Sequence, residues 1–241
     1  IGTYVELSMS SEMSGNIIDL CPVGALTSKP FRFSARTWEM KQVPGIAPHD
    51  SVGSNIHFHI KNDRIKRVVP AENESINEVW ISDRDRFSYE ALYSEDRLTT
   101  PMVKTDGEWQ EVEWDIALEA VKDRLQSVIA SEGAEKIGSL ISATSSSEEA
   151  YLLQKILRDL GSNNIDHRLG QQDFSDQDEA PAFPWLGQSI ADLENLDAAL
   201  IIGSNLRKEQ PLLNHRLRKA SLKGANIMQV NSLGYKFNYK L

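Results

Sequence analysis

The chain carries an apolar run that leads directly into a loop of small residues, Leu200-Ile201-Ile202-Gly203-Ser204-Asn205. Such a run is typical of a buried strand that ends where the glycine begins the loop. A helix is predicted to follow over residues 209–222, and another strand over residues 225–230. A strand, a helix and a strand in this order favour an α/β sheet whose strands run parallel.

The region before this run shows the same alternation. Asp115 is a candidate N-cap for a helix whose apolar residues recur at helical spacing up to about Ala130. An apolar strand is predicted over residues 137–142.

A second helix is predicted to begin at Ser145 or Ser146, each of which has a glutamate three residues later. This spacing is the pattern of a capping box. Gly161 fits the C-terminal stop of the same helix. Together these elements predict a three-layer, mainly parallel α/β domain over residues 97–241.

Short strands are predicted between residues 37 and 96, which we interpret as a small β-rich domain. Apolar and polar residues alternate over 55–60 and again over 64–69, with a turn-like segment between them, as in a β-hairpin. His57 and His59 share one face of the first strand, where a metal pair is conceivable. No third ligand is near in sequence, so packed or solvated strand residues are the simpler interpretation.

Residues 1–36 contain Cys21, the single cysteine of the chain, followed directly by Pro22. A Cys-Pro step closes the ligand run of bacterial-type ferredoxins, where the thiolate binds iron. Because a 4Fe–4S cluster needs four ligands, the other three are expected before Ile1. The chain is therefore expected to be a piece of a longer protein, incomplete at both ends. The alternative is a structural thiol, since free cysteine is often buried.

Composition limits the function classes. The chain has 241 residues, of which 40% are hydrophobic and 25% charged, as in ordinary globular domains. A net charge of −9 and the lack of a basic patch argue against nucleic acid as a partner. The apolar runs are too short to span a bilayer, and one cysteine cannot form an internal disulfide.

The segment Ser14–Phe31, with Ala35–Glu39 after it, resembles the large iron–sulfur subunit of respiratory complex I, the NADH-quinone oxidoreductase. In mitochondria this subunit is called the 75-kDa subunit, and bacteria have a counterpart of it. The resemblance continues through four further segments and covers most of the chain: Ser51–Ile56, Trp80–Asp83, Arg97–Met102 and Leu160–Arg168.

The resemblance implies that residues 1–36 are the C-terminal tail of a ferredoxin-like iron–sulfur domain. It implies that Cys21 is the fourth ligand of a 4Fe–4S cluster in the full-length parent, and that the isolated chain holds no cluster. The parent would pass electrons from NADH and flavin toward quinone, as part of an enzyme. No residue of this chain is expected to be catalytic, and the chain alone is expected to have no activity.

The same resemblance implies partners and a location. The partners would be other subunits of the peripheral arm of complex I, without direct insertion into the membrane. That arm would lie on the cytoplasmic face of the bacterial inner membrane, or on the matrix side in a mitochondrion.

Residues 37–96 also resemble the iron–sulfur domain that opens molybdopterin oxidoreductases such as formate dehydrogenase. The four ligand positions of that domain fall at Ala47, Asp50, Ser54 and Ser82, none of which is cysteine. The resemblance thus implies that the fold is kept without its cluster, and that residues 97–241 begin a molybdopterin-oxidoreductase-like domain without molybdopterin. A true molybdopterin-dependent oxidoreductase, or a pure structural scaffold, are the alternatives.

Three other groups of residues are candidate sites. The loop Gly203–Asn205 lies where α/β sheets bind ligands, although a plain strand-to-helix turn also needs small residues. His167, within Asp166–Asp173, would need Ser162 or Ser175 beside it to act in a triad, and no nucleophile elbow is present. The carboxylates of the third group suggest a solvated loop or a bound cation: Asp173, Asp176, Asp178 and Glu179.

Overall fold

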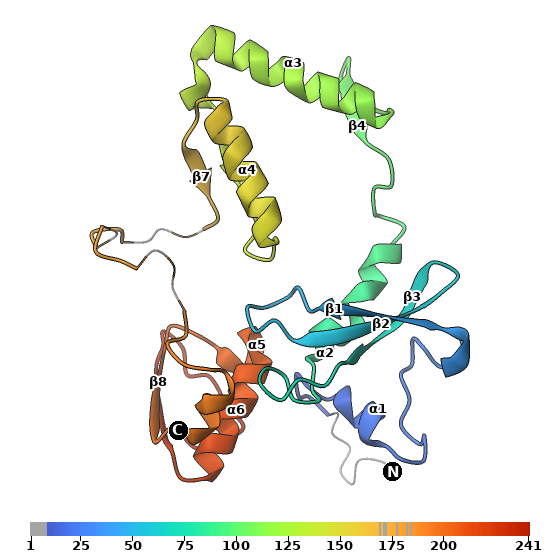
Figure 1. Ribbon diagram of the computed structural model, residues 1–241, viewed down its shortest axis with the longest axis vertical. Coiled ribbons are helices and arrows are strands. Elements are labelled where there is room, and N and C mark those ends of the chain that lie inside the picture. Colours follow the sequence, from blue (N-terminus) through green and yellow to red (C-terminus); the bar gives the residue numbers. More distant parts are fainter. Residues whose placement is uncertain (1–8, 169, 171–172, 177, 182, 184) are drawn as a thin grey trace. The chain divides into compact units, whose positions relative to one another are not determined.

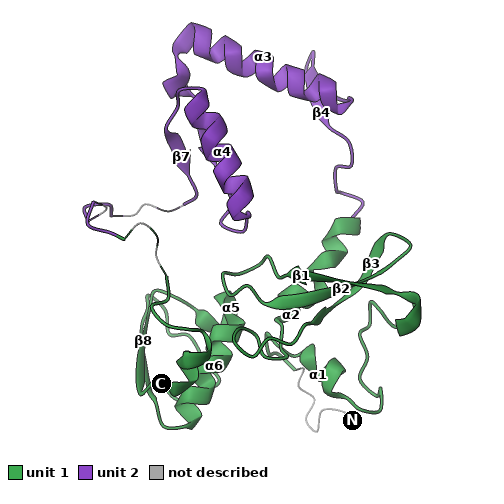
Figure 2. Ribbon diagram, in the orientation of Figure 1, with its two compact units in different colours: residues 1–93, 181–241 green, residues 94–180 purple. Residues whose placement is uncertain are grey.

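The computed structural model describes residues 9–168, 170, 173–176, 178–181, 183 and 185–241. The chain divides into two compact units (Figure 2). Unit 1 consists of residues 1–93 together with 181–241, and unit 2 consists of residues 94–180.

Unit 1 contains a three-stranded antiparallel sheet in the order β1 (Lys41–Ile46), β2 (Asn55–Lys61) and β3 (Arg64–Pro70) (Figure 1). The predicted hairpin is therefore confirmed. Its two turn residues, Asn62 and Asp63, have φ angles of 51° and 55°. Two left-handed residues in a two-residue turn match the right-handed twist of the strands, and Asn and Asp tolerate this conformation.

The sheet packs over a small apolar core next to α2 (Asp83–Phe87). Ser82 is the N-cap of α2, because its hydroxyl accepts a hydrogen bond from the Asp85 N–H at 3.1 Å. Two short 3-10 helices flank the sheet in sequence, Thr37–Glu39 and Ser88–Tyr93. The core consists of four buried residues: Ala47, Ile56, Val68 and Ile81.

A single-turn helix, α1 (Asn16–Leu20), ends directly before Cys21. The sequence contains no strong signal for it, because five residues are too few to show an apolar periodicity. Between Cys21 and Arg36 the chain forms turns without a helix or strand.

The C-terminal part of unit 1 contains η4 (Ala191–Asn195), β8 (Ala198–Ile202), α5 (Leu206–Glu209), α6 (Pro211–Leu222) and β9 (Asn226–Val230). The two strands pair in parallel, as the sequence predicts. Their shared core is Ile201, Leu217 and Ile227.

The single helix predicted over residues 209–222 is wrong in its first turn. The structure has two helices that are separated at Gln210, because Pro211 begins α6 as its first residue. Proline is favoured at that position but disfavours helical backbone in the residue before it. Gln210 accordingly has φ −134° and ψ 67°.

Unit 2 begins with a hairpin of β4 (Met102–Thr105) and β5 (Glu108–Glu111), which the sequence pattern does not predict. Then follow α3 (Trp114–Glu132), the 3-10 helix Ala134–Lys136, β6 (Gly138–Leu140), α4 (Ser147–Asp159) and β7 (Asn164–Asp166). Strands β6 and β7 pair in parallel.

The caps of unit 2 correct one prediction and resolve another. Glu113 is the N-cap of α3, so the N-cap predicted at Asp115 is wrong, and that aspartate lies in the first turn. The capping box of α4 uses Ser146, whose hydroxyl accepts from the Glu149 N–H at 3.2 Å. Gly161 follows the end of α4 with φ 93°, as expected of a helix stop.

The mixed α/β class is confirmed, but the strands form small sheets. The two parallel pairs belong to different units, and each contains two strands. A single three-layer, mainly parallel sheet therefore stays a prediction. None of the helices in the described part of the chain combines the length and the apolarity that a bilayer crossing requires.

The capping box generates a test. Ser146→Ala removes the acceptor for the Glu149 N–H, and we expect it to destabilise α4 by about 1 kcal/mol. Ser145→Ala is the matched control, because Ser145 lies outside the box. Hydrogen exchange of the α4 amides measures both, and equal effects of the two variants would contradict the assignment.

Candidate functional site

The segment around α1 is fixed to residues 81–86 by hydrogen bonds. Asn16 is 4% exposed, and its amide bonds the backbone of one residue twice. Its Nδ2 donates to the Ile81 carbonyl at 2.7 Å, and its Oδ1 accepts from the Ile81 N–H at 3.1 Å. Buried backbone groups need hydrogen-bond partners. The Asn16 amide supplies them for Ile81, as the backbone of a neighbouring strand would in a sheet.

Asp83 holds the start of α1. Its Oδ1 accepts from the Gly15 N–H and its Oδ2 from the Ser14 hydroxyl, both at 2.6 Å. Its own N–H donates to the Glu12 carbonyl at 2.8 Å. A carboxylate that accepts two short hydrogen bonds is a strong anchor.

Arg86 completes the attachment from α2. Its side chain is 5% exposed, and Nη2 donates to Asn16 Oδ1 at 3.0 Å and to Asp19 Oδ2 at 2.5 Å. We call Asn16, Asp19, Asp83 and Arg86 the α1 clamp. Because Asp19 lies two residues before Cys21, the clamp fixes the backbone that leads into the thiol.

Cys21 lies in a tight loop that presents backbone N–H groups to the sulfur. Hydrogen bonds from the N–H of Leu26 first, and then of Val23, lower the pKa of the Cys21 thiol. The thiol is partly exposed. Iron binds the thiolate, so this loop fits one ligand of an iron–sulfur cluster. The chain itself supplies one of the four thiolates that such a cluster needs.

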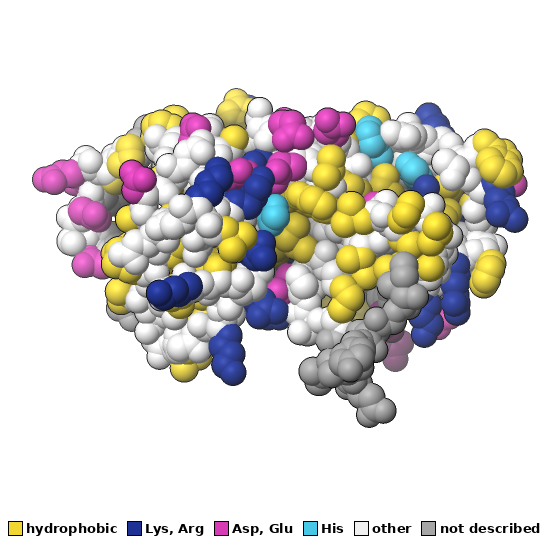
Figure 3. Space-filling view, turned by 90° about the horizontal axis from the view of Figure 1, so that it is seen from below, with side chains coloured by type: hydrophobic (Ala, Val, Ile, Leu, Met, Phe, Trp, Pro, Cys, Tyr) yellow, Lys and Arg dark blue, Asp and Glu magenta, His cyan; other side chains and the backbone are white. Residues whose placement is uncertain are grey.

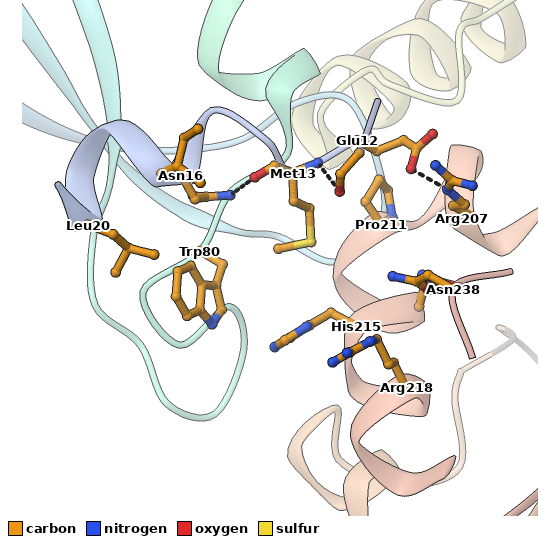
Figure 4. Close-up of a pocket in the computed structure, with 13 residues that line it drawn as sticks. Glu12, Met13, Asn16, Leu20, Trp80, Arg207, Pro211, His215, Arg218 and Asn238 are labelled. Carbon is orange, nitrogen blue, oxygen red and sulfur yellow. Dashed lines mark hydrogen bonds and ion pairs between the residues drawn. The ribbon is translucent and has the colours of Figure 1, made fainter. Parts of the chain in front are cut away.

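The other end of the segment is held by the C-terminal part of unit 1. The Glu12 carboxylate pairs with Arg207 at 2.6 Å (Figure 4). It also pairs with Lys208 at 2.5 Å. Burial would raise the pKa of Glu12, but hydrogen bonds from these two cations outweigh it and lower the pKa. The segment is therefore attached at both ends within unit 1.

A pocket of about 390 Å³ lies between α1 and α6 in this unit. The rings of Trp80 and His215 meet edge to face, with their centres 6.1 Å apart (Figure 4). Burial lowers the pKa of His215 despite the nearby carboxylate of Glu78. The lowered pKa favours the neutral form of His215, whose ring packs against the ring of Trp80.

A second ion network ties α6 to the turn after β3. Arg216 pairs with Glu194 and donates to the Glu74 carbonyl at 2.7 Å. Lys219 bonds Glu78 and Glu194, each at 2.6 Å. Figure 3 shows a face on which acidic, basic and histidine side chains lie close together beside a group of hydrophobic side chains. These interactions make unit 1 one packed body rather than two linked pieces.

The four positions that resemble cluster ligands lie in the interior of the small sheet domain. Ala47, Ser54 and Ser82 are at most 3% exposed, and the Asp50 side chain is fully buried. The Ala47 N–H donates to the Ser54 carbonyl at 2.8 Å, and the Ser82 hydroxyl donates to Asp85 Oδ2 at 2.7 Å. Hydroxyl and carboxylate oxygens are hard ligands and alanine has none, so these residues do not fit an iron–sulfur cluster.

Three buried side-chain oxygens near this interior have no hydrogen-bond partner. Asp50 Oδ2, Ser54 Oγ and Asp85 Oδ1 are buried without a hydrogen-bond partner. Burial raises the pKa of Asp50, and the negative charge of Asp85 adds to the shift. The ionised form of Asp50 therefore costs stability in the folded chain.

One histidine of the β2 pair, His59, has a structural explanation, whereas His57 Nδ1 is buried without a hydrogen-bond partner. His59 is 8% exposed, and its Nδ1 lies 3.0 Å from Arg67 Nε, which donates to it. Burial lowers the pKa of His59, with the charge of Arg67 as a further cause. Within the described ranges, no group of three or more His, Cys, Asp or Glu side chains is arranged to hold a metal ion.

The loop Gly203–Asn205 binds a carboxylate of its own chain. Glu209 accepts from the Ser204 hydroxyl at 2.6 Å and from the Asn205 N–H at 3.0 Å. Two donors that a phosphate would need are thus already paired with a negative charge. The loop does not fit the anionic part of a pterin nucleotide in this arrangement.

Among the described residues, no hydrogen bond joins His167 to Ser162, which precedes β7, or to Ser175, which follows it. Ser162 is 1% exposed, and its hydroxyl donates to the Ile137 carbonyl at 2.6 Å. Hydrogen bonds from Arg168 and from the His167 N–H lower the pKa of Asp166 to about 2. Asp173 caps a turn, because its Oδ1 accepts a hydrogen bond from the Ser175 N–H at 2.9 Å. These residues stabilise loop turns. Three further residues of the segment lie outside the described part of the chain: Leu169, Gln171 and Gln172.

The sequence indicates Cys21 but not the residues that position it. Asn16, Asp83 and Arg86 are separated from one another by up to 70 residues. A pattern within a short window cannot show that an arginine becomes buried. The one available signal is Ser82 followed by the charged run Asp83–Arg86, which suggests a helix start.

Comparison with protein families covers the chain in three parts. The family described as molybdopterin oxidoreductase matches residues 97–241. Residues 40–90 match the NDSU1/NuoG-like 4Fe-4S domain of NADH-ubiquinone oxidoreductase. Residues 1–27 match the ferredoxin-like domain of NADH-quinone oxidoreductase subunit 3.

Curated relatives agree with these matches. The G subunit of NADH-quinone oxidoreductase of Rickettsia felis is 40% identical over 98% of the chain, which corresponds to 35% of that protein. The 75 kDa subunit of NADH-ubiquinone oxidoreductase of Reclinomonas americana is 36% identical over 93% of the chain and 33% of its own length. The mitochondrial iron-sulfur protein 1 of NADH dehydrogenase of Solanum tuberosum is 42% identical over 91% of the chain, which corresponds to 29% of that protein. The chain thus spans about a third of the length of these relatives.

The α1 clamp generates a stability test. A Cβ on Gly15 would lie 2.7 Å from Arg86 Cδ and 2.8 Å from Asp83 Oδ1, so Gly15→Ala must displace the clamp. We expect a loss of about 1–3 kcal/mol in the free energy of unfolding of unit 1. Gly234→Ala is the control, because no atom lies within 4 Å of its Cβ position. Thermal unfolding measures both, and equal melting temperatures would contradict the clamp.

The raised pKa of Asp50 generates a pH test. A carboxyl whose folded pKa is raised adds stability below its unfolded pKa and loses it as the pH rises through the folded pKa. Asp50→Asn should therefore raise the melting temperature at pH 7–8, by roughly 2–4 °C per kcal/mol gained, and the gain should disappear in acid. Asp63→Asn, in an exposed turn, is the control. If Asp50→Asn raised the melting temperature equally at every pH, the burial of a charged carboxylate at Asp50 would not be the cause of the gain.

Proposed function

The chain belongs to the molybdopterin oxidoreductase family, and from this premise we propose that it is part of the iron–sulfur electron-transfer subunit of NADH-quinone oxidoreductase, respiratory complex I. The observation that carries the proposal is Cys21, whose thiolate is stabilised by backbone N–H groups at the end of a clamped helix. The names of the relatives and of the matching iron–sulfur domains support it.

Cys21 is the fourth ligand of a 4Fe–4S cluster whose other ligands belong to the remainder of the full-length protein. When bound, such a cluster accepts and passes on one electron at a time. The residues of this chain contribute by position: the N–H groups of residues 23–26 stabilise the thiolate, and the α1 clamp fixes the approach to it. No residue of the chain acts on a substrate.

We divide the chain into three domains: 1–36 as the tail of a ferredoxin-like domain, 37–96 as a cluster-free small β domain, and 97–241 as the start of a molybdopterin-oxidoreductase-like domain. The limits of the three family matches support this division. Strand pairing β6–β7 and β8–β9 supports a parallel sheet in the last domain. In the parent, the helices would cover that sheet on both faces.

The last domain is proposed to work without a molybdopterin. The support is the loop Gly203–Asn205, where Glu209 already occupies the donors that a phosphate would use. The substituted positions Ala47, Asp50, Ser54 and Ser82 likewise disfavour a cluster in the small β domain. A molybdopterin-dependent oxidoreductase is therefore the less favoured function.

As part of complex I, the full-length protein would contact other subunits of the peripheral arm. Depending on the organism, that arm faces the bacterial cytoplasm or the mitochondrial matrix. The electrons it carries would come from NADH through flavin and leave toward quinone.

The full-length parent provides the test. Cys21→Ser replaces a soft thiolate with a hydroxyl, so we expect the loss of one 4Fe–4S signal in low-temperature electron paramagnetic resonance of the reduced protein. Val23→Ala is the control, because Val23 is 76% exposed in the same loop and has no ligand atom. An unchanged spectrum of the Cys21→Ser protein would show that the thiol is structural.

A second arm uses the 241-residue chain alone. Anaerobic reconstitution with iron and sulfide should yield no stoichiometric four-iron cluster, because a single thiolate is present. One stable four-iron cluster per chain would mean that the ligand set was assigned wrongly.

A further inference from the structure

A second pocket of unit 1 has a volume of about 360 Å³ and shares no lining residue with the pocket beside Trp80. Side chains of α1, of the loop that follows it, of β3 and of residues 86–89 line this second pocket. One carboxylate, that of Asp19, lies among four arginines, although the chain as a whole has a net charge of −9. A cavity of this size takes a small organic molecule. The arginines are Arg32, Arg36, Arg67 and Arg86.

Arg67 is partly buried in this pocket without a balancing charge of its own. Its Nε donates to His59 Nδ1 at 3.0 Å, and its guanidinium lies 4.5 Å from the centre of the Phe31 ring. Among the described residues Arg67 belongs to no ion pair, whereas Arg86 pairs with Asp19. Burial lowers the pKa of Arg67, and although the charge of Asp19 opposes this shift, that of Arg86 adds to it. An anion beside the guanidinium would offset the cost of burying its charge.

The two inner arginines share a single counter-charge. Arg86 has a side chain that is 5% exposed and lies 2.5 Å from the Asp19 carboxylate. Because the pKa of Arg67 responds to both of these groups, the three charges lie within reach of one another. One positive charge is therefore left over inside the pocket, and the exposed arginines of the lining, Arg32 and Arg36, add to it. A phosphate monoester, which carries a charge of about −1.5 to −2 at pH 7, matches this excess better than a single carboxylate does.

Apolar side chains form much of the remaining lining. The rings of Phe31 and Tyr89 are partly buried there. The Tyr89 hydroxyl already donates to the Lys66 carbonyl at 2.9 Å, so Tyr89 offers its ring to a ligand. A few charged groups in an otherwise apolar cavity are typical of a site for a small molecule that has an anionic end and an apolar body.

We propose that this pocket binds a phosphate monoester of a small aromatic or aliphatic body. Arg67 and Arg86 bind the phosphate, and Phe31 and Tyr89 lie beside the body. Planar guanidinium groups can bond two phosphate oxygens at once, which gives such contacts both strength and direction. The inference does not rest on a cluster at Cys21, so its test and the test of the proposed function are independent.

The experiment is isothermal titration calorimetry of the full-length protein with phenyl phosphate. We expect one bound molecule per chain. Inorganic phosphate, which lacks the ring, and benzoate, which carries a single charge, should both bind more weakly. Arg67→Met should weaken the binding of phenyl phosphate about tenfold or more, the loss expected for a charge-assisted contact. Arg67→Lys keeps the charge but loses the planar fork, so its affinity should lie between the two.

Arg64→Met is the matched control. Arg64 also lies on β3 and its guanidinium also covers an aromatic ring, that of Tyr93 at 4.2 Å, but it does not line the pocket. Its affinity for phenyl phosphate should therefore equal that of the parent. If Arg67→Met does not fold, the double variant Arg32→Gln and Arg36→Gln takes its place, because both side chains are exposed, and it should also weaken binding. The absence of binding, an equal affinity for benzoate or inorganic phosphate, or equal losses in the pocket variant and in Arg64→Met would overturn the inference.

Discussion

One buried guanidinium, that of Arg86, joins α2 to the segment around α1. It bonds the amide of Asn16 and the carboxylate of Asp19, about 70 residues earlier in the chain. A buried charge without such partners would cost several kcal/mol, so the segment before Cys21 is required for Arg86 to be buried at all. Conversely, a five-residue helix has too few hydrogen bonds to be stable alone. Helix α1 and the burial of Arg86 therefore depend on each other, and together they fix the backbone that leads to the Cys21 thiol.

The same segment also depends on the C-terminal part of unit 1. Glu12 accepts from two cations of α5, while its carbonyl bonds Asp83. The packed units thus do not follow the order of the sequence, since residues 181–241 form one unit with residues 1–93. The segment that leads into the Cys21 loop is therefore held by elements that lie far apart in the sequence.

The sequence predicted those features that depend on neighbours in the chain. The hairpin of β2 and β3, the capping box at Ser146 and the strand β8 follow from local alternation, turn residues and caps. It did not predict α1, the break at Gln210 or the burial of Arg86. The first is stabilised by a distant arginine, and the second depends on how Pro211 competes with a continuous apolar pattern. For the site, the sequence indicated the thiol, whereas its supports lie on another part of the chain.

The interior of the small sheet domain has a consequence for assembly. A domain that uses cysteines to bind a cluster often folds only once the metal is present, because the metal supplies the free energy of folding. Here Ala47, Ser54 and Ser82 are buried instead, with a backbone hydrogen bond from Ala47 to Ser54 and no partner for the Ser54 hydroxyl. Because these positions carry no cysteine, we expect this domain to fold without iron and to hold Asn16 and Asp19 in place before any cluster is bound. If Cys21 binds a cluster as proposed, insertion of that cluster would be a late event on an already folded chain, and iron supply would limit maturation without limiting the yield of folded chain.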